Sequence, residues 1–174
     1  MKNILLICVV SMSFFACKKE EKPAATTTTT TPGDGTMKCS IDGVAFSSDA
    51  TYTAAAKNGD GYTFSAPQSP GPGGYKAIAI SLHGVPELVV NKTYPLKGYP
   101  AAIGEGFGSY SPSYGVKDSP TSSSDSTNSG SITITKYDAA AKKVSGTFNF
   151  KAIDGKTKVV TAITAGTFDD VNCQ

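Results

Sequence analysis

Three side chains in this sequence could carry acid–base chemistry: the lone histidine His83 and the glutamates Glu87 and Glu105. A histidine beside a carboxylate can serve hydrolysis as a general base, and two carboxylates about 5–10 Å apart can cleave glycosides. No G-x-S-x-G nucleophile elbow surrounds any serine. Zinc sites usually need two or three histidines or free thiolates. We therefore expect no enzyme, no metal and no cofactor, and the alternative is a hydrolase that uses His83 with a loop carboxylate.

Four tyrosines in the glycine- and proline-rich middle of the chain favour a different kind of site. Tyrosine combines a flat apolar ring with a polar tip, which suits a wet binding surface. We expect these rings to form a ligand patch for a glycan or a peptide. The alternative is that they cover one open end of the domain. The residues are Tyr94, Tyr99, Tyr110 and Tyr114.

The first residues predict export and a lipid anchor. Lys2 precedes an apolar run over residues 4–16, which is shorter than the roughly 18 residues that a spanning helix needs. A short apolar run after a basic start is typical of a secretory signal peptide, here residues 1–16. The ending Phe15-Ala16-Cys17 resembles the lipobox of bacterial lipoproteins. That resemblance implies cleavage before Cys17, lipid on its thiol and its amine, and attachment to a membrane.

The residues after Cys17 indicate on which side of the membrane the domain would lie. Lys19, Glu20 and Glu21 resemble the export signal of surface lipoproteins in Bacteroidetes. The resemblance implies an outer-membrane protein on the cell surface, and the periplasmic face is the alternative. Residues 17–36 hold six consecutive threonines and no large apolar side chain, so we expect a disordered, lipidated linker.

From residue 37 the chain predicts one all-β domain over residues 37–174. Short alternating stretches lie between turn signals such as Asp42-Gly43, and no window keeps a helical period. Tyr75–Leu82 is the most apolar strand predicted after the signal, and Lys143–Ala152 is predicted to be a strand with a bulge at Gly146. Residues 101–115 favour neither helix nor regular strand. We expect roughly nine to ten short strands in an antiparallel sandwich or barrel, two forms that alternation does not distinguish.

The cysteines suggest one disulfide bond. Cys8 leaves with the signal and Cys17 would carry lipid, so Cys39 and Cys173 remain at the two ends of the domain. In an oxidising cell envelope such a pair favours a disulfide, which requires Cα atoms within roughly 7 Å. We therefore expect the first and last strands to be neighbours. The alternative is two free buried thiols.

The C-terminal part carries a second resemblance. Residues 131–171 contain ITKYD, then SGTFNF and ITAGTFDDV, and resemble a family of Bacteroidetes lipoproteins of unknown function. The resemblance implies an all-β domain on a lipid tether and transfers no catalytic residue. Asp125-Ser126-Thr127 resembles the O-glycosylation signal of exported Bacteroidetes proteins, which makes Ser126 a candidate for modification.

The charge balance argues against some classes of binding partner. Sixteen cations face fourteen acids, and every cation is a lysine. A near-neutral chain without arginine indicates no nucleic-acid partner and no bidentate phosphate clamp. The sequence thus predicts a monomeric, lipid-anchored envelope protein with a non-catalytic binding domain. A hydrolase and an accessory subunit of an envelope assembly are the alternatives.

Overall fold

The computed structural model describes residues 33–69, 75–114 and 121–174, which fold into eleven strands. The predicted all-β class is confirmed, with slightly more strands than expected. Within this described part, no helix is long and apolar enough to cross a membrane. The strands are β1 Met37–Ile41, β2 Val44–Ser47, β3 Ala54–Asn58, β4 Gly61–Pro67, β5 Tyr75–Leu82, β6 Thr93–Leu96, β7 Gly106–Tyr114, β8 Ser122–Ser123, β9 Gly130–Asp138, β10 Lys143–Asp154 and β11 Val160–Cys173.

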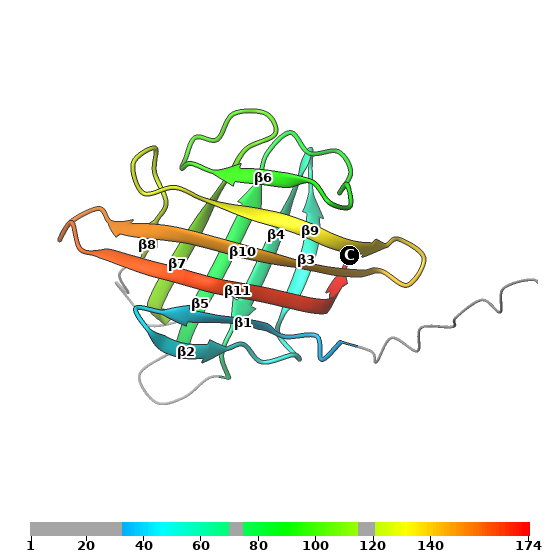
Figure 1. Cartoon of the computed structure of the whole chain (residues 1–174), viewed down its shortest axis with the longest axis horizontal. Coiled ribbons are helices and arrows are strands. Elements are labelled where there is room, and N and C mark those ends of the chain that lie inside the picture. Colours follow the sequence, from blue (N-terminus) through cyan, green and yellow to red (C-terminus); the bar gives the residue numbers. More distant parts are fainter. Residues whose placement is uncertain (1–32, 70–74, 115–120) are drawn as a thin grey trace, which may run out of the picture. The chain divides into compact units, whose positions relative to one another are not determined.

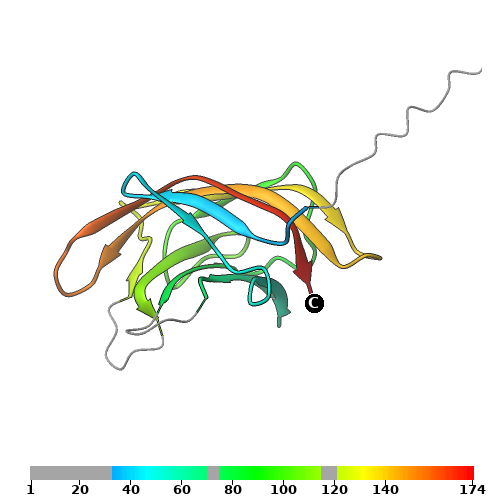
Figure 2. The same cartoon turned by 90° about the horizontal axis from the view of Figure 1, so that it is seen from below.

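The strands form two crossed layers. In Figure 1, β1, β2, β6, β9, β10 and β11 run across the view, and β3, β4, β5 and β7 run up behind them. Figure 2 shows one layer lying over the other. Short pairings join the layers at two corners, because β11 pairs with β3 in parallel and β6 pairs with β7 at one residue. The structure therefore combines the two expected forms: a crossed sandwich whose pairings close into a ring.

The hydrophobic core lies between the two layers. Along each strand every second side chain points inward, so Phe64 of β4 and Ile80 of β5 face Ile132 of β9 and Phe168 of β11. All four are buried, and the rings of Phe64 and Phe168 meet with centroids 5.3 Å apart. The opposite, outward faces of the same strands are consequently free to form a surface site.

The first and last strands are neighbours, but their register keeps the two cysteines apart. Met37 lies opposite Phe168 in the antiparallel β1–β11 pair. Cys39 therefore lies near residue 166, seven residues before Cys173, which is about 23 Å along the strand at roughly 3.3 Å per residue. Both thiols are free and buried. The predicted Cys39–Cys173 disulfide is wrong, because the bond needs neighbouring cysteines as well as neighbouring strands.

Both thiols should be unreactive in the folded protein and reactive in the unfolded one. Burial raises the pKa of the Cys39 thiol to about 12 and raises the pKa of Cys173. The thiolate is the nucleophile, so maleimide should modify the native protein slowly at neutral pH. In denaturant without reductant, mass spectrometry should find both cysteines modified. If maleimide modified the two cysteines only after reduction, the result would contradict the free thiols.

The first described residues, from Gly33, contact the β-domain four residues before the predicted boundary at residue 37. The Gly33 amide donates to Asp170 Oδ2 at 2.8 Å, and the Gly35 amide donates to the Asp169 carbonyl at 3.0 Å. Lys136 Nζ donates to the other Asp170 oxygen at 2.8 Å. Asp170 thus joins the end of the linker to β9 and β11. This contact gives a structural reason for the second aspartate of the ITAGTFDDV segment.

Acid should weaken this junction. The hydrogen bonds from Lys136 and from the Gly33 amide lower the pKa of Asp170. A lowered pKa contributes stability above the unfolded value of about 3.9, and that stability is lost as the pH falls through the folded value. Asp170→Asn should therefore be less stable than the wild type at pH 6, and the difference should shrink below about pH 4. Urea unfolding at several pH values measures it, with exposed Asp60→Asn as control. A difference that does not change with pH would contradict this role.

Candidate functional site

A small-residue platform forms on the outward face of three central strands. Because Tyr62, Phe64 and Ala66 of β4 point into the core, the residues between them point outward. The same alternation in β5 and β7 brings small side chains into register, with Ser65 opposite Ala79 and Ala79 opposite Ser109. We call this face the platform. It consists of Thr63, Ser65, Ala77, Ala79, Ser81 and Ser109.

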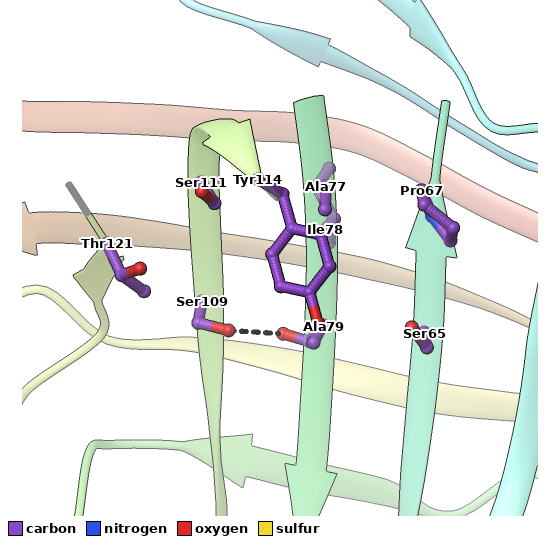
Figure 3. Close-up of a pocket in the computed structure, with 9 residues that line it drawn as sticks. All are labelled: Ser65, Pro67, Ala77, Ile78, Ala79, Ser109, Ser111, Tyr114 and Thr121. Atoms are coloured by element: carbon purple, nitrogen blue, oxygen red, sulfur yellow. Dashed lines mark hydrogen bonds between the residues drawn. The ribbon is translucent and has the colours of Figure 1, made fainter. Parts of the chain in front are cut away.

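An aromatic pair lies at each end of the platform. At one end the rings of Tyr75 and Tyr114 meet edge to face with centroids 5.4 Å apart. At the other end Tyr99 and Phe107 meet in the same way at 5.8 Å. Figure 3 shows the Tyr114 ring lying across β5 over Ala77 and Ala79. The Tyr114 ring thus covers part of the platform floor on β5 (Figure 3), and the Tyr99–Phe107 pair lies at the Ser81 end.

The hydroxyl groups of the platform make few hydrogen bonds within the protein. Thr63 Oγ1 and Ser81 Oγ lie 3.3 Å apart, and Ser109 Oγ donates to the Ala79 carbonyl at 3.4 Å. Each serine or threonine oxygen has two lone pairs and one proton. These groups therefore keep capacity for a further hydrogen bond to a ligand or to water.

The platform also differs in charge from the outward face of the other layer. None of its six residues is charged, although the sequence holds 16 cationic and 14 acidic residues. The outward positions of the other layer include Lys38, Lys151 and Asp169, all exposed. The platform is therefore a neutral area, unlike the outward face of the other layer.

The four predicted tyrosines do not form one patch. Tyr94 is fully buried and accepts a hydrogen bond from the Val89 amide at 3.3 Å, and Tyr110 is buried in the core. Tyr99 and Tyr114 are 82% and 53% exposed but lie at opposite ends of the platform. The expectation of a single cluster is wrong, since strand alternation turns Tyr94 and Tyr110 inward. Sequence reasoning missed Tyr75 and Phe107, which pair with the two exposed rings.

The residues of the hydrolase alternative have separate partners. His83 Nδ1 lies 3.6 Å from Asp60 Oδ1, and both side chains are more than half exposed. Glu105 binds Lys97 through its carboxylate and meets His83 only through the backbone, where the His83 amide donates to its carbonyl. Glu87 lines a different hollow, beside Lys57 and Lys92. The three side chains do not converge in one cleft.

The other predicted sites are placed only in part. Ser126 is exposed in a tight turn, where Asp125 Oδ1 accepts hydrogen bonds from the Thr127 and Asn128 amides at 2.8 and 2.5 Å. Its modification stays a prediction. The signal at 1–16, the lipidation site Cys17 and the export residues Lys19, Glu20 and Glu21 lie outside the described residues.

Fold and surface together define a class: a small all-β domain with one neutral face bounded by aromatic rings. The chain belongs to the family of domains of unknown function DUF6252, which matches residues 33–172. The match starts at the residue where Asp170 holds the linker. No curated protein and no solved structure matches the chain. Membership confirms the prediction of an uncharacterised family.

Proposed function

We propose that this chain is a lipid-anchored envelope protein whose β-domain is a non-catalytic binding module on the cell surface. Lipid on Cys17 would attach it to the outer membrane, and Lys19, Glu20 and Glu21 would direct it outward. The sequence patterns support both steps, because the apolar run is too short to span and ends at the cysteine. The proposed linker, residues 17–36, would connect the anchor to the domain.

The platform carries the proposed binding role. Tyrosine and serine are the residues that antibody binding sites favour, because a rigid ring gives contact area and a hydroxyl gives adaptable hydrogen bonds. Here exposed Tyr99 and Tyr114 flank a floor that includes Ser65 and Ser109. This combination on a rigid, doubly paired sheet supports recognition of a ligand from solution.

The binding role is favoured over the hydrolase alternative by the partners of the candidate residues. A general base must lie within hydrogen-bond reach of the proton that it removes, and its orientation is usually fixed by a third group. Among the described residues, His83 pairs with the exposed Asp60 carboxylate, and Lys97 holds the Glu105 carboxylate. No observation favours the accessory-subunit alternative.

A large cation in the middle of the platform should abolish binding. Ser65 is exposed and lies beside Ala79, the central residue of the platform, so Ser65→Arg would place a long charged side chain on the floor. Thr147→Arg is the matched control, since Thr147 is an exposed hydroxyl residue in the middle of β10 on the other layer. Detergent-solubilised full-length protein should be tested on glycan and peptide arrays.

We expect wild type and Thr147→Arg to bind the same array ligand and Ser65→Arg to lose it by at least about tenfold. Thermal melting shows whether both variants keep the fold. Equal binding by the two folded variants would contradict the platform as the site. Absence of any array ligand for the wild type would contradict the binding function.

A further inference from the structure

The absence of charged side chains from the floor of the platform favours an uncharged ligand. A protein that binds an anion or a cation places the opposite charge on the contact surface, because complementary potentials steer and select the partner. The floor holds only serine, threonine and alanine side chains, and its bounding rings come from tyrosine and phenylalanine. The charge complement of the floor is therefore a neutral ligand, and the titratable group beside it is His83, which lines the hollow with Tyr99 and Phe107.

The strand pairings argue against an extended peptide. A peptide that binds a sheet usually adds a strand to a free edge, where its backbone finds unpaired groups. On this face β4 pairs with β3 and β5, β5 pairs with β4 and β7, and β7 pairs with β5 and β8. β4 and β5 are thus paired on both sides, and β7 pairs with β8 at Ser109 and Tyr110. Beside Ser65, Ala79 and Ser109 the backbone therefore offers no edge to a peptide.

The dimensions argue against a small enclosed molecule. The hollow beside Tyr114 holds about 140 Å³, below the roughly 300–1,000 Å³ of sites that engulf a small ligand. Along β5, six residues separate Tyr75 from Ser81, the residue opposite Phe107. That separation is about 20 Å at roughly 3.3 Å per residue. A ligand that contacts both Tyr75 and Phe107 must therefore be elongated and shallow, and the Tyr114 ring over Ala77 and Ala79 lies beneath its path (Figure 3).

Resting on the proposed function, we infer that the platform binds a neutral polysaccharide chain that lies along β5. Sugar rings expose apolar C–H faces that stack on flat aromatic rings, and their hydroxyls match the floor. Tyr114 would stack at one end, and Phe107 with the highly exposed Tyr99 at the other. Ser65 and Ser109 would exchange hydrogen bonds with sugar hydroxyls directly or through water.

The test is affinity electrophoresis of the detergent-solubilised full-length protein in gels that contain one polymer each. The neutral probes are dextran, mannan and mixed-linkage glucan, the acidic probe is polygalacturonate, and the peptide probe is unfolded casein. At least one neutral polysaccharide should retard the protein. Retardation should be equal at 50 mM and 500 mM salt, because salt screens only charge interactions.

Ring variants separate stacking from a merely structural role. Tyr114→Ala and Phe107→Ala should each weaken binding about tenfold. Tyr114→Phe keeps the ring, so it should bind within about twofold of the wild type if stacking dominates. Ser65→Arg should abolish retardation and Thr147→Arg should not. Melting temperatures identify any variant that has lost the fold.

Three results would overturn the polysaccharide assignment. They are retardation by polygalacturonate or casein alone, binding that high salt removes, and no retardation by any neutral polymer. The first two leave the proposed binding function intact if Ser65→Arg abolishes them. The third leaves that function to be decided by the glycan and peptide arrays.

Discussion

Replacement of Cys17 by alanine should move the protein out of the membrane fraction or leave its signal peptide uncleaved. One acyl chain gives only marginal membrane binding, whereas two or more anchor a protein stably. A wild-type protein lipidated on Cys17 should therefore remain with the membranes through high-salt washes, and it should incorporate labelled palmitate. Cys17→Ala should lose the label completely, which makes this the largest effect that we expect.

Cys8→Ala is the matched control, since Cys8 is a second cysteine in the same N-terminal segment and lies within the proposed signal peptide. It should keep normal cleavage, labelling and membrane attachment. Two results together would refute the anchor. The Cys17→Ala protein would be cleaved and remain in the washed membranes, and the wild-type protein would carry no palmitate label.

Phe150→Ala should cost about 3–5 kcal/mol in the free energy of unfolding, which is the usual range for a buried phenylalanine. Phe150 of β10 is only 2% exposed, and its ring lies flat against Gly108 of β7 in the other layer. A Cβ at Gly108 would come within 2.7 Å of that ring. Phe150 therefore holds the two layers together, and its loss leaves a cavity between them.

Urea unfolding measures this cost, and Lys151→Ala is the control because the next residue is exposed. A surface change of this kind should stay within about 0.5 kcal/mol of the wild type. Gly108→Ala should also destabilise, by about 1–3 kcal/mol, because the added methyl overpacks the same contact. A loss for Phe150→Ala no larger than that for Lys151→Ala would contradict the packing.

Local alternation predicted the parts of the fold that depend on one strand at a time. The period of two puts Ile132 and Ile134 on one face of residues 131–137 and Phe150 on one face of residues 143–152, and all three are buried. The ladder is irregular at Gly146, as expected, but the extra residue is Thr135 of β9, because Ser145 lies opposite Lys136 and Gly146 opposite Ile134. A Cβ at position 146 would lie 2.2 Å from the Thr133 carbonyl oxygen. Close packing of the neighbouring strand therefore requires glycine at this position.

Features that depend on register between distant strands could not be predicted in this way. The β1–β11 pairing was expected, but its register separates Cys39 from Cys173. The glycine-rich residues 101–115 were read as irregular, yet Gly106–Tyr114 forms β7. Gly106 and Gly108 reduce strand propensity, but they give room to Leu82 and Phe150 of neighbouring strands. Tertiary packing here outweighs propensity.

About half of the aromatic residues of the candidate site were predicted from the sequence. Tyr99 and Tyr114 were among the predicted residues, whereas Tyr75 and Phe107 were not. A usable signal was present in residues 75–82, where alanine and serine alternate with Ile78 and Ile80. That alternation already indicated a strand with one apolar side and one small-residue side. Which strands lie beside it on the same face follows only from the topology.

The central claim is that a neutral binding face is displayed on the outside of the cell, and one labelling measurement tests it. Ser65→Cys places a thiol on the platform, while Cys39 and Cys173 are buried and contribute little background. A membrane-impermeant maleimide should label Ser65→Cys on intact cells, and the polysaccharide that binds most tightly should slow the labelling. Replacing Lys19, Glu20 and Glu21 with alanine should delay labelling until lysis. Labelling of Ser65→Cys only after lysis, with the export residues intact, would contradict the account.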